Sequence, residues 1–181
     1  MEPSKVIQYP GFQFASPPRT GTAWFTKYAH SIGLGERTRS NVHFPHEVTS
    51  EPRLTIVRHP CDWLASYFLN VYPACLCVPC VDIFRLLPGM TFDCFVAGYL
   101  KKHKGAIGDM FAAYNATDYI RLEDVPVAAD TFIHSIGIKT QKIQGTPIAA
   151  NTSRTMKPLW DRSLWQDVME SEKEYVQKYG Y

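Results

Sequence analysis

Short apolar runs alternate along the chain with longer segments whose apolar residues recur at helical spacing. The runs 11–16, 54–57 and 119–122 are short and rich in β-branched or aromatic residues, which is typical of buried strands. Amphipathic spacing predicts helices over 22–32, 60–72, 91–103, 107–114, a segment after Asp124 that ends near Ile136, and 161–179. Because strands alternate with helices through long connections, the pattern predicts an α/β fold with a parallel sheet flanked by helices.

The size and composition of the chain fit one ordinary globular domain. It has 181 residues without a repeat, low-complexity tract or linker, so we predict a single domain over 1–181. Hydrophobic residues make up 45% of the chain and charged residues 20%, as in soluble proteins. Nineteen basic and seventeen acidic residues leave a net charge of +2, which disfavours nucleic acid as a main partner. Any anion-binding site is therefore expected to consist of a few residues and not of a broad basic surface.

The sequence also allows a prediction of where in the cell the protein is found. Residues 1–10 lack the apolar core of a signal peptide, and no stretch approaches the roughly 20 apolar residues of a membrane span. The five cysteines are an odd number, which favours reduced thiols. We therefore predict a cytoplasmic protein that does not associate with membranes.

Three cysteines cluster at Cys75, Cys77 and Cys80. Their spacing could supply three thiolates to zinc, with Cys61 or Cys94 as a fourth ligand. The segment is otherwise apolar and has no second Cys-x-x-Cys pair, so buried thiols that act as small hydrophobic groups are the favoured interpretation. We predict that the protein holds no metal.

The segment 18–24 follows the first predicted strand and leads into a helix. Such a loop exposes backbone N–H groups at the positive end of the helix, and Gly21 permits close approach of an oxyanion. Thr20 and Thr22 offer hydroxyl donors, and Arg19 adds a positive charge. No Gly-Lys-Ser/Thr ends the segment, so it is not the magnesium-associated phosphate loop of kinases. The alternative is a Gly-Thr turn before an ordinary helix. The residues expected to contact an anion are Arg19, Thr20, Gly21, Thr22, Ala23 and Trp24.

A second candidate anion site follows the second predicted strand. Arg58 ends that strand, and Ser66 comes eight residues later, almost two turns into the next helix. A guanidinium can bind two phosphate oxygens at once while a serine hydroxyl donates a third hydrogen bond. The alternative is an arginine at a strand end followed by an unrelated helical serine. With both segments present in this order, we favour a ligand that carries two phosphate-like groups.

These two segments together resemble the sulfotransferase superfamily. Its members bind 3′-phosphoadenosine 5′-phosphosulfate (PAPS) with a Pro-(Lys/Arg)-Ser/Thr-Gly-Thr loop at the 5′-phosphosulfate. An arginine and a serine eight residues apart bind the 3′-phosphate. The resemblance implies a nucleotide-binding fold like that of P-loop proteins, PAPS as the donor without a metal, and an acceptor hydroxyl or amine. The acceptor is not identified by the sequence: it could be a small alcohol, a phenol, a sugar or a peptide.

The resemblance also suggests catalytic residues. The segment His43-Phe44-Pro45 is similar to the His-Leu-Pro of cytosolic sulfotransferases, whose histidine is the catalytic base. His46 and Glu47 are rival bases, since some branches use a carboxylate, and an ordinary surface histidine is the remaining alternative. Arg19 stands where many cytosolic members have lysine, and the resemblance places its charge at the leaving oxygen.

Two later segments resemble the family more loosely. Arg121-Leu122-Glu123-Asp124 is similar to its (Arg/Tyr)-Tyr-Glu-Asp segment, with Leu122 in place of a tyrosine near the adenine. Ser153 and Arg154 lie in a segment that looks like the late loop closing over the 3′-phosphate. Two other functions stay open: a small nucleotide kinase, and a non-catalytic module that binds a bisphosphate nucleotide.

Overall fold

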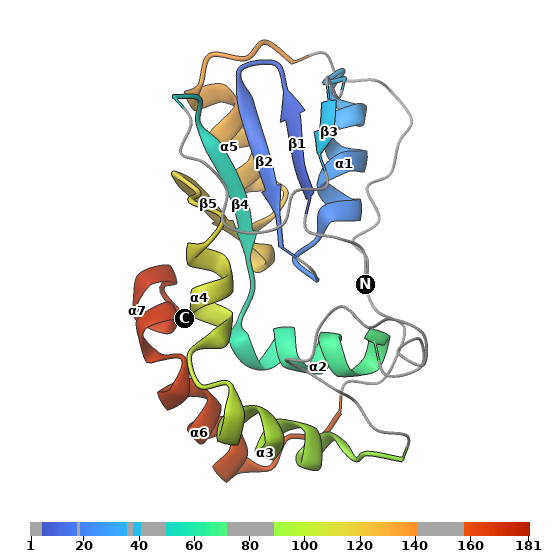
Figure 1. Cartoon of the computed structure of the whole chain (residues 1–181). Coiled ribbons are helices and arrows are strands. Elements are labelled where there is room, and N and C mark those ends of the chain that lie inside the picture. The colour runs from blue at the N-terminus through green and yellow to red at the C-terminus, as the bar shows by residue number, and fades with distance from the viewer. Residues whose placement is uncertain (1–4, 18, 36–37, 41–49, 72–88, 141–157) are drawn as a thin grey trace. The chain divides into compact units, whose positions relative to one another are not determined.

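The computed structural model of the chain (Figure 1) describes residues 5–17, 19–35, 38–40, 50–71, 89–140 and 158–181. These residues divide into two compact units. We call them the sheet unit, with Glu2–Arg58 and Phe111–Thr152, and the helical unit, with His59–Met110 and Ser153–Tyr181. That the two units make up a single domain stays a prediction.

The sheet unit contains a five-stranded mixed sheet with the strand order β3-β1-β2-β4-β5. Its strands are β1 (Lys5–Tyr9), β2 (Phe12–Ser16), β3 (Thr38–Ser40), β4 (Arg53–Val57) and β5 (Asp118–Arg121). The β2–β4 and β4–β5 pairs are parallel, whereas β1 pairs antiparallel with both β2 and β3. The predicted α/β fold is therefore confirmed, and the three predicted strands, β2, β4 and β5, are parallel as expected. The predicted parallel sheet needs a correction, because β1 and β3 make the sheet as a whole mixed. The cause is the tight turn between β1 and β2, where Gly11 takes a φ of 82° and reverses the chain.

One face of the sheet carries the hydrophobic core of this unit. Alternate residues of β1, β2, β4 and β5 point to it, and helices α1 (Thr22–Ser31) and α5 (Val127–Ser135) cover it. The rings of Phe14 and Phe25 stack with centroids 4.0 Å apart. The Tyr28 hydroxyl of α1 donates to the Asp130 carboxylate of α5 over 2.5 Å. Both predicted helices of this unit are confirmed. Because α1 packs against this face directly after β2, its first turn lies near the end of that strand.

The helical unit consists of helices from three parts of the chain. They are α2 (Pro60–Val71), α3 (Phe92–Lys102), most of α4 (Ala106–Ala112), α6 (Arg162–Ser171) and α7 (Lys173–Tyr179). Aromatic rings fill the space between α2 and α3, where Trp63 stacks on Tyr67 and Tyr67 on Phe95. The predicted helices 60–72, 91–103 and 107–114 are confirmed within about two residues at each end.

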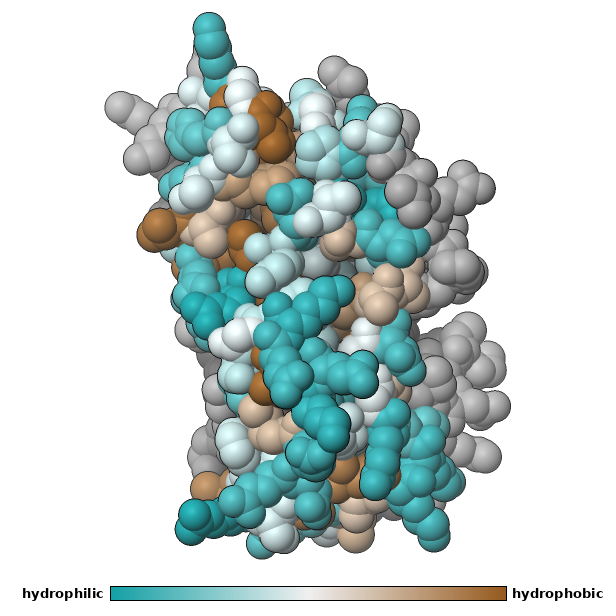
Figure 2. Space-filling view, turned by 90° about the vertical axis from the view of Figure 1, so that its left-hand side faces the viewer, coloured by the Kyte–Doolittle hydropathy of each residue, from teal (hydrophilic) through white to brown (hydrophobic). Residues whose placement is uncertain are grey.

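Large apolar side chains are exposed at only a few places in the described part of the chain. They are Tyr119, Val127, Leu159 and Trp165. Figure 2 shows one face of the molecule, on which hydrophobic residues are interspersed among hydrophilic ones. The longest described helix has 12 residues, and none of the described helices is long and apolar enough to cross a membrane.

The predicted C-terminal helix 161–179 is interrupted at Glu172, which separates α6 from α7. The Glu172 side chain is buried and accepts hydrogen bonds from the Tyr99 hydroxyl and, over 3.0 Å, from the Gly108 backbone N–H. Burial of a carboxylate is costly unless donors surround it, and these contacts supply them. Glu172 thus joins three helical segments of this unit.

The pKa of Glu172 gives a prediction for stability. Burial raises the pKa of Glu172, while the hydrogen bonds from Tyr99 and the backbone oppose the rise. Between the unfolded pKa and the raised folded pKa, the folded protein binds more protons than the unfolded chain. The free energy of unfolding should therefore fall as pH rises from about 4.3 through the folded pKa, by about 1.4 kcal/mol for each pH unit that separates the two pKa values.

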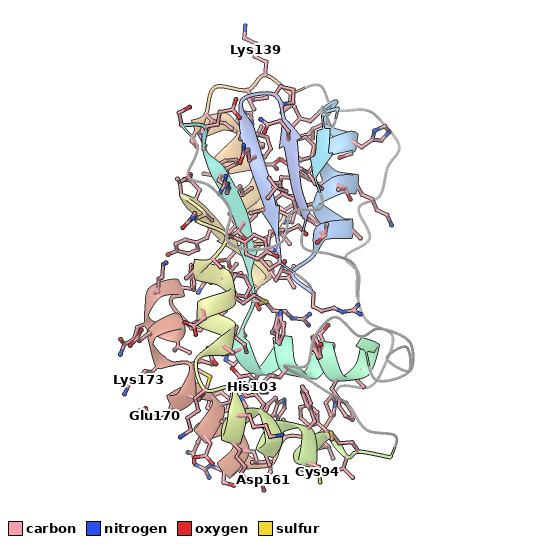
Figure 3. All side chains as sticks on the ribbon, viewed as in Figure 1. Cys94, His103, Lys139, Asp161, Glu170 and Lys173 are labelled. Atoms are coloured by element: carbon pink, nitrogen blue, oxygen red, sulfur yellow. The ribbon has the colours of Figure 1, made fainter. Side chains whose placement is uncertain are left out.

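Urea unfolding of the wild type and of Glu172→Gln between pH 4 and 8 measures this effect. The glutamine variant should lose that part of the pH dependence. Glu170→Gln is the matched control, because Glu170 is an exposed carboxylate in the last turn of α6, close to Glu172 in sequence. It pairs with Lys173 over 2.9 Å, and Figure 3 labels Glu170 and Lys173. A wild-type pH profile in Glu172→Gln would contradict the assignment.

Candidate anion-binding site

The carboxyl ends of β2, β4 and β5 lie at the same edge of the sheet, because these three neighbouring strands are parallel. Three segments follow those ends: the loop before α1, of which the structure describes residues 17 and 19–21, then Arg58, and the short 3₁₀ helix Leu122–Asp124. Ligands of open α/β sheets bind at this edge of the strands. The sequence-predicted loop and Arg58 therefore lie where such folds place a site.

The loop after β2 has an unusual backbone. Arg19 and Gly21 both have positive φ angles, 65° and 89°. Gly21 is the N-cap of α1, and among the described residues no side chain caps this helix and its first turn carries no acidic residue. The positive end of the α1 dipole is thus not offset by a nearby carboxylate of that turn. Backbone N–H groups at such a helix start favour an anion.

The loop hydroxyls bind within the segment itself. Thr20 is fully buried, and its hydroxyl donates to the Pro17 carbonyl oxygen over 2.7 Å. The hydroxyls of Ser16 and Thr22 share a hydrogen bond. In this structure these two threonine side chains hold the loop, and hydroxyl contacts to a ligand stay a prediction.

Arg58 contacts the loop directly. Its Nη1 atom donates to the carbonyl oxygen of Arg19 over 3.2 Å. The two arginines come from different strand ends, 39 residues apart in sequence, yet a hydrogen bond joins them. The next strand end has an arginine as well, but Arg121 forms an ion pair with Asp124 over 2.7 Å. The Arg58 guanidinium therefore lies against the backbone of the loop that precedes α1.

The other predicted loop contacts differ in exposure. Ala23 is exposed, whereas Trp24 is buried in the core and stacks on Tyr28 with ring centroids 5.2 Å apart. The Trp24 ring thus has a structural role, and its contact with a nucleotide stays a prediction. A Cβ atom on Gly21 would lie only 2.8 Å from Cδ1 of Leu122, so this close approach requires glycine.

Two residues at this edge escaped the sequence-based predictions. Ser16 shares the hydrogen bond with Thr22, and the Tyr114 hydroxyl donates to the Ser16 carbonyl oxygen over 3.4 Å. Ser16 adjoins the predicted loop, so its polar side chain at a strand end was a usable signal. Tyr114 is 98 residues away and gives none.

Other predicted residues cannot be placed at this site. Ser66 is half-buried on α2, in the helical unit, so its pairing with Arg58 on a phosphate stays a prediction. The candidate bases and the late loop lie outside the described residues, as does the cysteine cluster. These residues are His43, His46, Glu47, Ser153, Arg154, Cys75, Cys77 and Cys80.

The two cysteines that the structure describes are both free thiols. Cys94 is exposed, whereas Cys61 is buried near the Trp165 carbonyl. Burial raises the pKa of Cys61 to about 12, so this thiol stays protonated at neutral pH. Within the described ranges, no group of three His, Cys, Asp or Glu side chains is placed to hold a metal ion.

The arrangement can bind an anion through backbone N–H groups, the α1 dipole and the Arg58 guanidinium, and a contact from the Arg19 side chain stays a prediction. No protein-family model, curated protein or solved structure matches the chain. What the chain binds is therefore inferred from its own residues.

Proposed function

We propose that the chain is a sulfotransferase that moves a sulfuryl group from PAPS to a hydroxyl or amine acceptor. The observation that carries this proposal is the hydrogen bond from Arg58 to the Arg19 carbonyl oxygen. It joins the residue expected at the 3′-phosphate to the loop expected at the 5′-phosphosulfate. The spacing of Arg58 and Ser66 and the order of the motifs support the same donor.

In this proposal the sheet unit uses a nucleotide-binding fold like that of P-loop proteins. The loop 17–21 follows a parallel strand and leads into α1, as an anion-binding loop of such a fold does. Its sequence lacks the Gly-Lys-Ser/Thr with which kinases hold a magnesium nucleotide. Sulfuryl transfer is therefore favoured over phosphoryl transfer.

The loop amides and Arg19 bind the 5′-phosphosulfate, and Arg58 with Ser66 binds the 3′-phosphate. During in-line transfer the bond from sulfur to the 5′-phosphate oxygen breaks, and a bond from sulfur to the acceptor forms. Arg19 and the amides stabilise the negative charge that develops on the leaving oxygen. His43 accepts the proton that the acceptor loses, because an imidazole titrates near neutral pH. The products are the sulfated acceptor and adenosine 3′,5′-bisphosphate.

A transfer assay with sulfur-labelled PAPS tests this function. The protein is incubated with the donor and a panel of alcohols, phenols, sugars, amines and peptides. We expect label to move to at least one acceptor class, with bisphosphate released in equal amount and no loss of rate on addition of EDTA. Nucleotide binding without transfer to any acceptor would instead indicate a binding module. Magnesium-dependent turnover of ATP would indicate a kinase.

A further inference from the structure

The loop after β2 has a conformation that needs external support. Arg19, which has a side chain, takes a φ of 65°, and Gly21 takes 89° only two residues later. A left-handed conformation is unfavourable at a residue with a Cβ, which then lies too close to a backbone carbonyl oxygen. Such a conformation persists only where surrounding contacts determine it.

Contacts from two neighbouring strands provide part of that support. Leu122, which follows β5, packs against the backbone of Gly21. Arg58, which follows β4, donates from Nη1 to the carbonyl oxygen of Arg19 over 3.2 Å. The hydrogen bond from Arg58 thus acts on Arg19, the residue whose left-handed conformation is unfavourable. It also orients the peptide group between Arg19 and Thr20, at the point where the loop turns towards α1.

We propose that Arg58 is a positioning residue for the 5′-phosphosulfate loop as well as a ligand of the 3′-phosphate. This inference rests on the proposed function and extends it. A ligand that lacks a 3′-phosphate still needs the loop in its binding conformation, so its affinity depends on Arg58. The two ends of the nucleotide site are thereby coupled. A 3′-phosphate that fixes Arg58 also fixes the loop that binds the 5′-phosphosulfate. By thermodynamic linkage, a group bound in the loop favours binding at Arg58 to the same extent.

Adenosine 5′-phosphosulfate, which has no 3′-phosphate, is the probe that separates the two roles. Calorimetry should show that Arg58→Ala weakens its binding about three- to tenfold, the effect of one net hydrogen bond. Ser66→Ala should weaken binding of adenosine 3′,5′-bisphosphate but not of this probe. Lys27→Ala is the charge control, because Lys27 is an exposed cation of α1. Unchanged binding of the probe to Arg58→Ala, with weakened binding of the bisphosphate, would overturn the positioning role.

Loss of the positive charge in Arg58→Ala would by itself also weaken the binding of an anionic probe. Arg58→Lys addresses this point, since lysine keeps the charge but its nitrogen ends one bond short of the Nη1 position. We expect Arg58→Lys to recover less than half of the binding free energy lost in Arg58→Ala. Full recovery in the lysine variant would show that charge, not the bond to Arg19, is responsible.

A ligand-free measurement keeps this inference separate from the proposed function. The amide nitrogen of Thr20 shares a peptide group with the Arg19 carbonyl, so its NMR chemical shift reports the Arg58 bond. The Thr20 signal should move in Arg58→Ala and Arg58→Lys but not in Lys27→Ala. If the wild type binds neither nucleotide, the proposed function fails, and this signal still decides the positioning role. An unmoved Thr20 signal in Arg58→Ala would overturn it.

Discussion

Replacing His43 with alanine should reduce the rate of sulfuryl transfer by about 10²–10⁴ while nucleotide affinity stays nearly unchanged. A general base acts on the acceptor proton as the transition state forms, and it contributes little to holding the donor. The measurement pairs initial rates with saturating acceptor and calorimetric binding of adenosine 3′,5′-bisphosphate. This is the largest effect expected from a single substitution in the chain.

The neighbouring residues supply the controls for His43. His46→Ala should have a mild effect, because the resemblance assigns the base to the histidine before Phe44-Pro45. Full activity in His43→Ala together with loss of activity in Glu47→Ala would show that the base is a carboxylate. Loss of both nucleotide binding and the folded state in His43→Ala would show that the histidine is structural.

The second large effect is expected at Gly21. Alanine there must adopt a φ of 89°, which costs about 1–2 kcal/mol. Its Cβ would also lie 2.8 Å from Cδ1 of Leu122, and relief of such overpacking costs about 1–3 kcal/mol more. We expect Gly21→Ala to lower the free energy of unfolding by about the sum of these terms. We also expect it to weaken nucleotide binding at least tenfold, because the loop amides move.

Gly137 offers a matched control for the backbone term. It has a similar φ of 75°, and among the described residues nothing lies within 4 Å of a Cβ built there. Gly137→Ala should therefore lower the free energy of unfolding only by the cost of the left-handed backbone conformation. Its nucleotide binding should stay unchanged. Leu122→Ala in the Gly21→Ala background should recover part of the lost stability, which a double-mutant cycle measures. Equal destabilisation by the two glycine substitutions would contradict the role of Leu122.

The sequence was sufficient to predict β2, β4, β5 and their helices. The run 54–57 is continuously apolar, and Pro60 with Asp62 marks a helix start, so β4 and α2 were predicted within a residue. β1 was not predicted, because its five residues give little periodicity and its pairing depends on the turn at Gly11. The break at Glu172 has no glycine or proline signal. It depends on donors from α3 and α4 that only the tertiary structure brings together.

The candidate site was predictable in composition but not in its internal contacts. Small residues, a glycine and an arginine after an apolar run predicted the loop, and Arg58 at a strand end predicted a second anion ligand. That Arg58 bonds to Arg19 follows from the parallel pairing of β2 with β4, which a pattern of residues does not specify. The Thr20 hydroxyl points to the Pro17 carbonyl oxygen because its neighbours Arg19 and Gly21 both have positive φ angles, which the sequence pattern does not specify.

The central claim is that one nucleotide with phosphates at both ends fits this protein. A thermal-shift comparison of adenosine 3′,5′-bisphosphate with AMP tests it most directly, because only the bisphosphate reaches both the loop and Arg58. At a hundred times its dissociation constant, a ligand adds about 2.7 kcal/mol to the free energy of unfolding. We predict a clearly larger shift of the melting temperature with the bisphosphate than with AMP at the same concentration, unchanged by EDTA. Equal shifts with the two nucleotides would contradict the account.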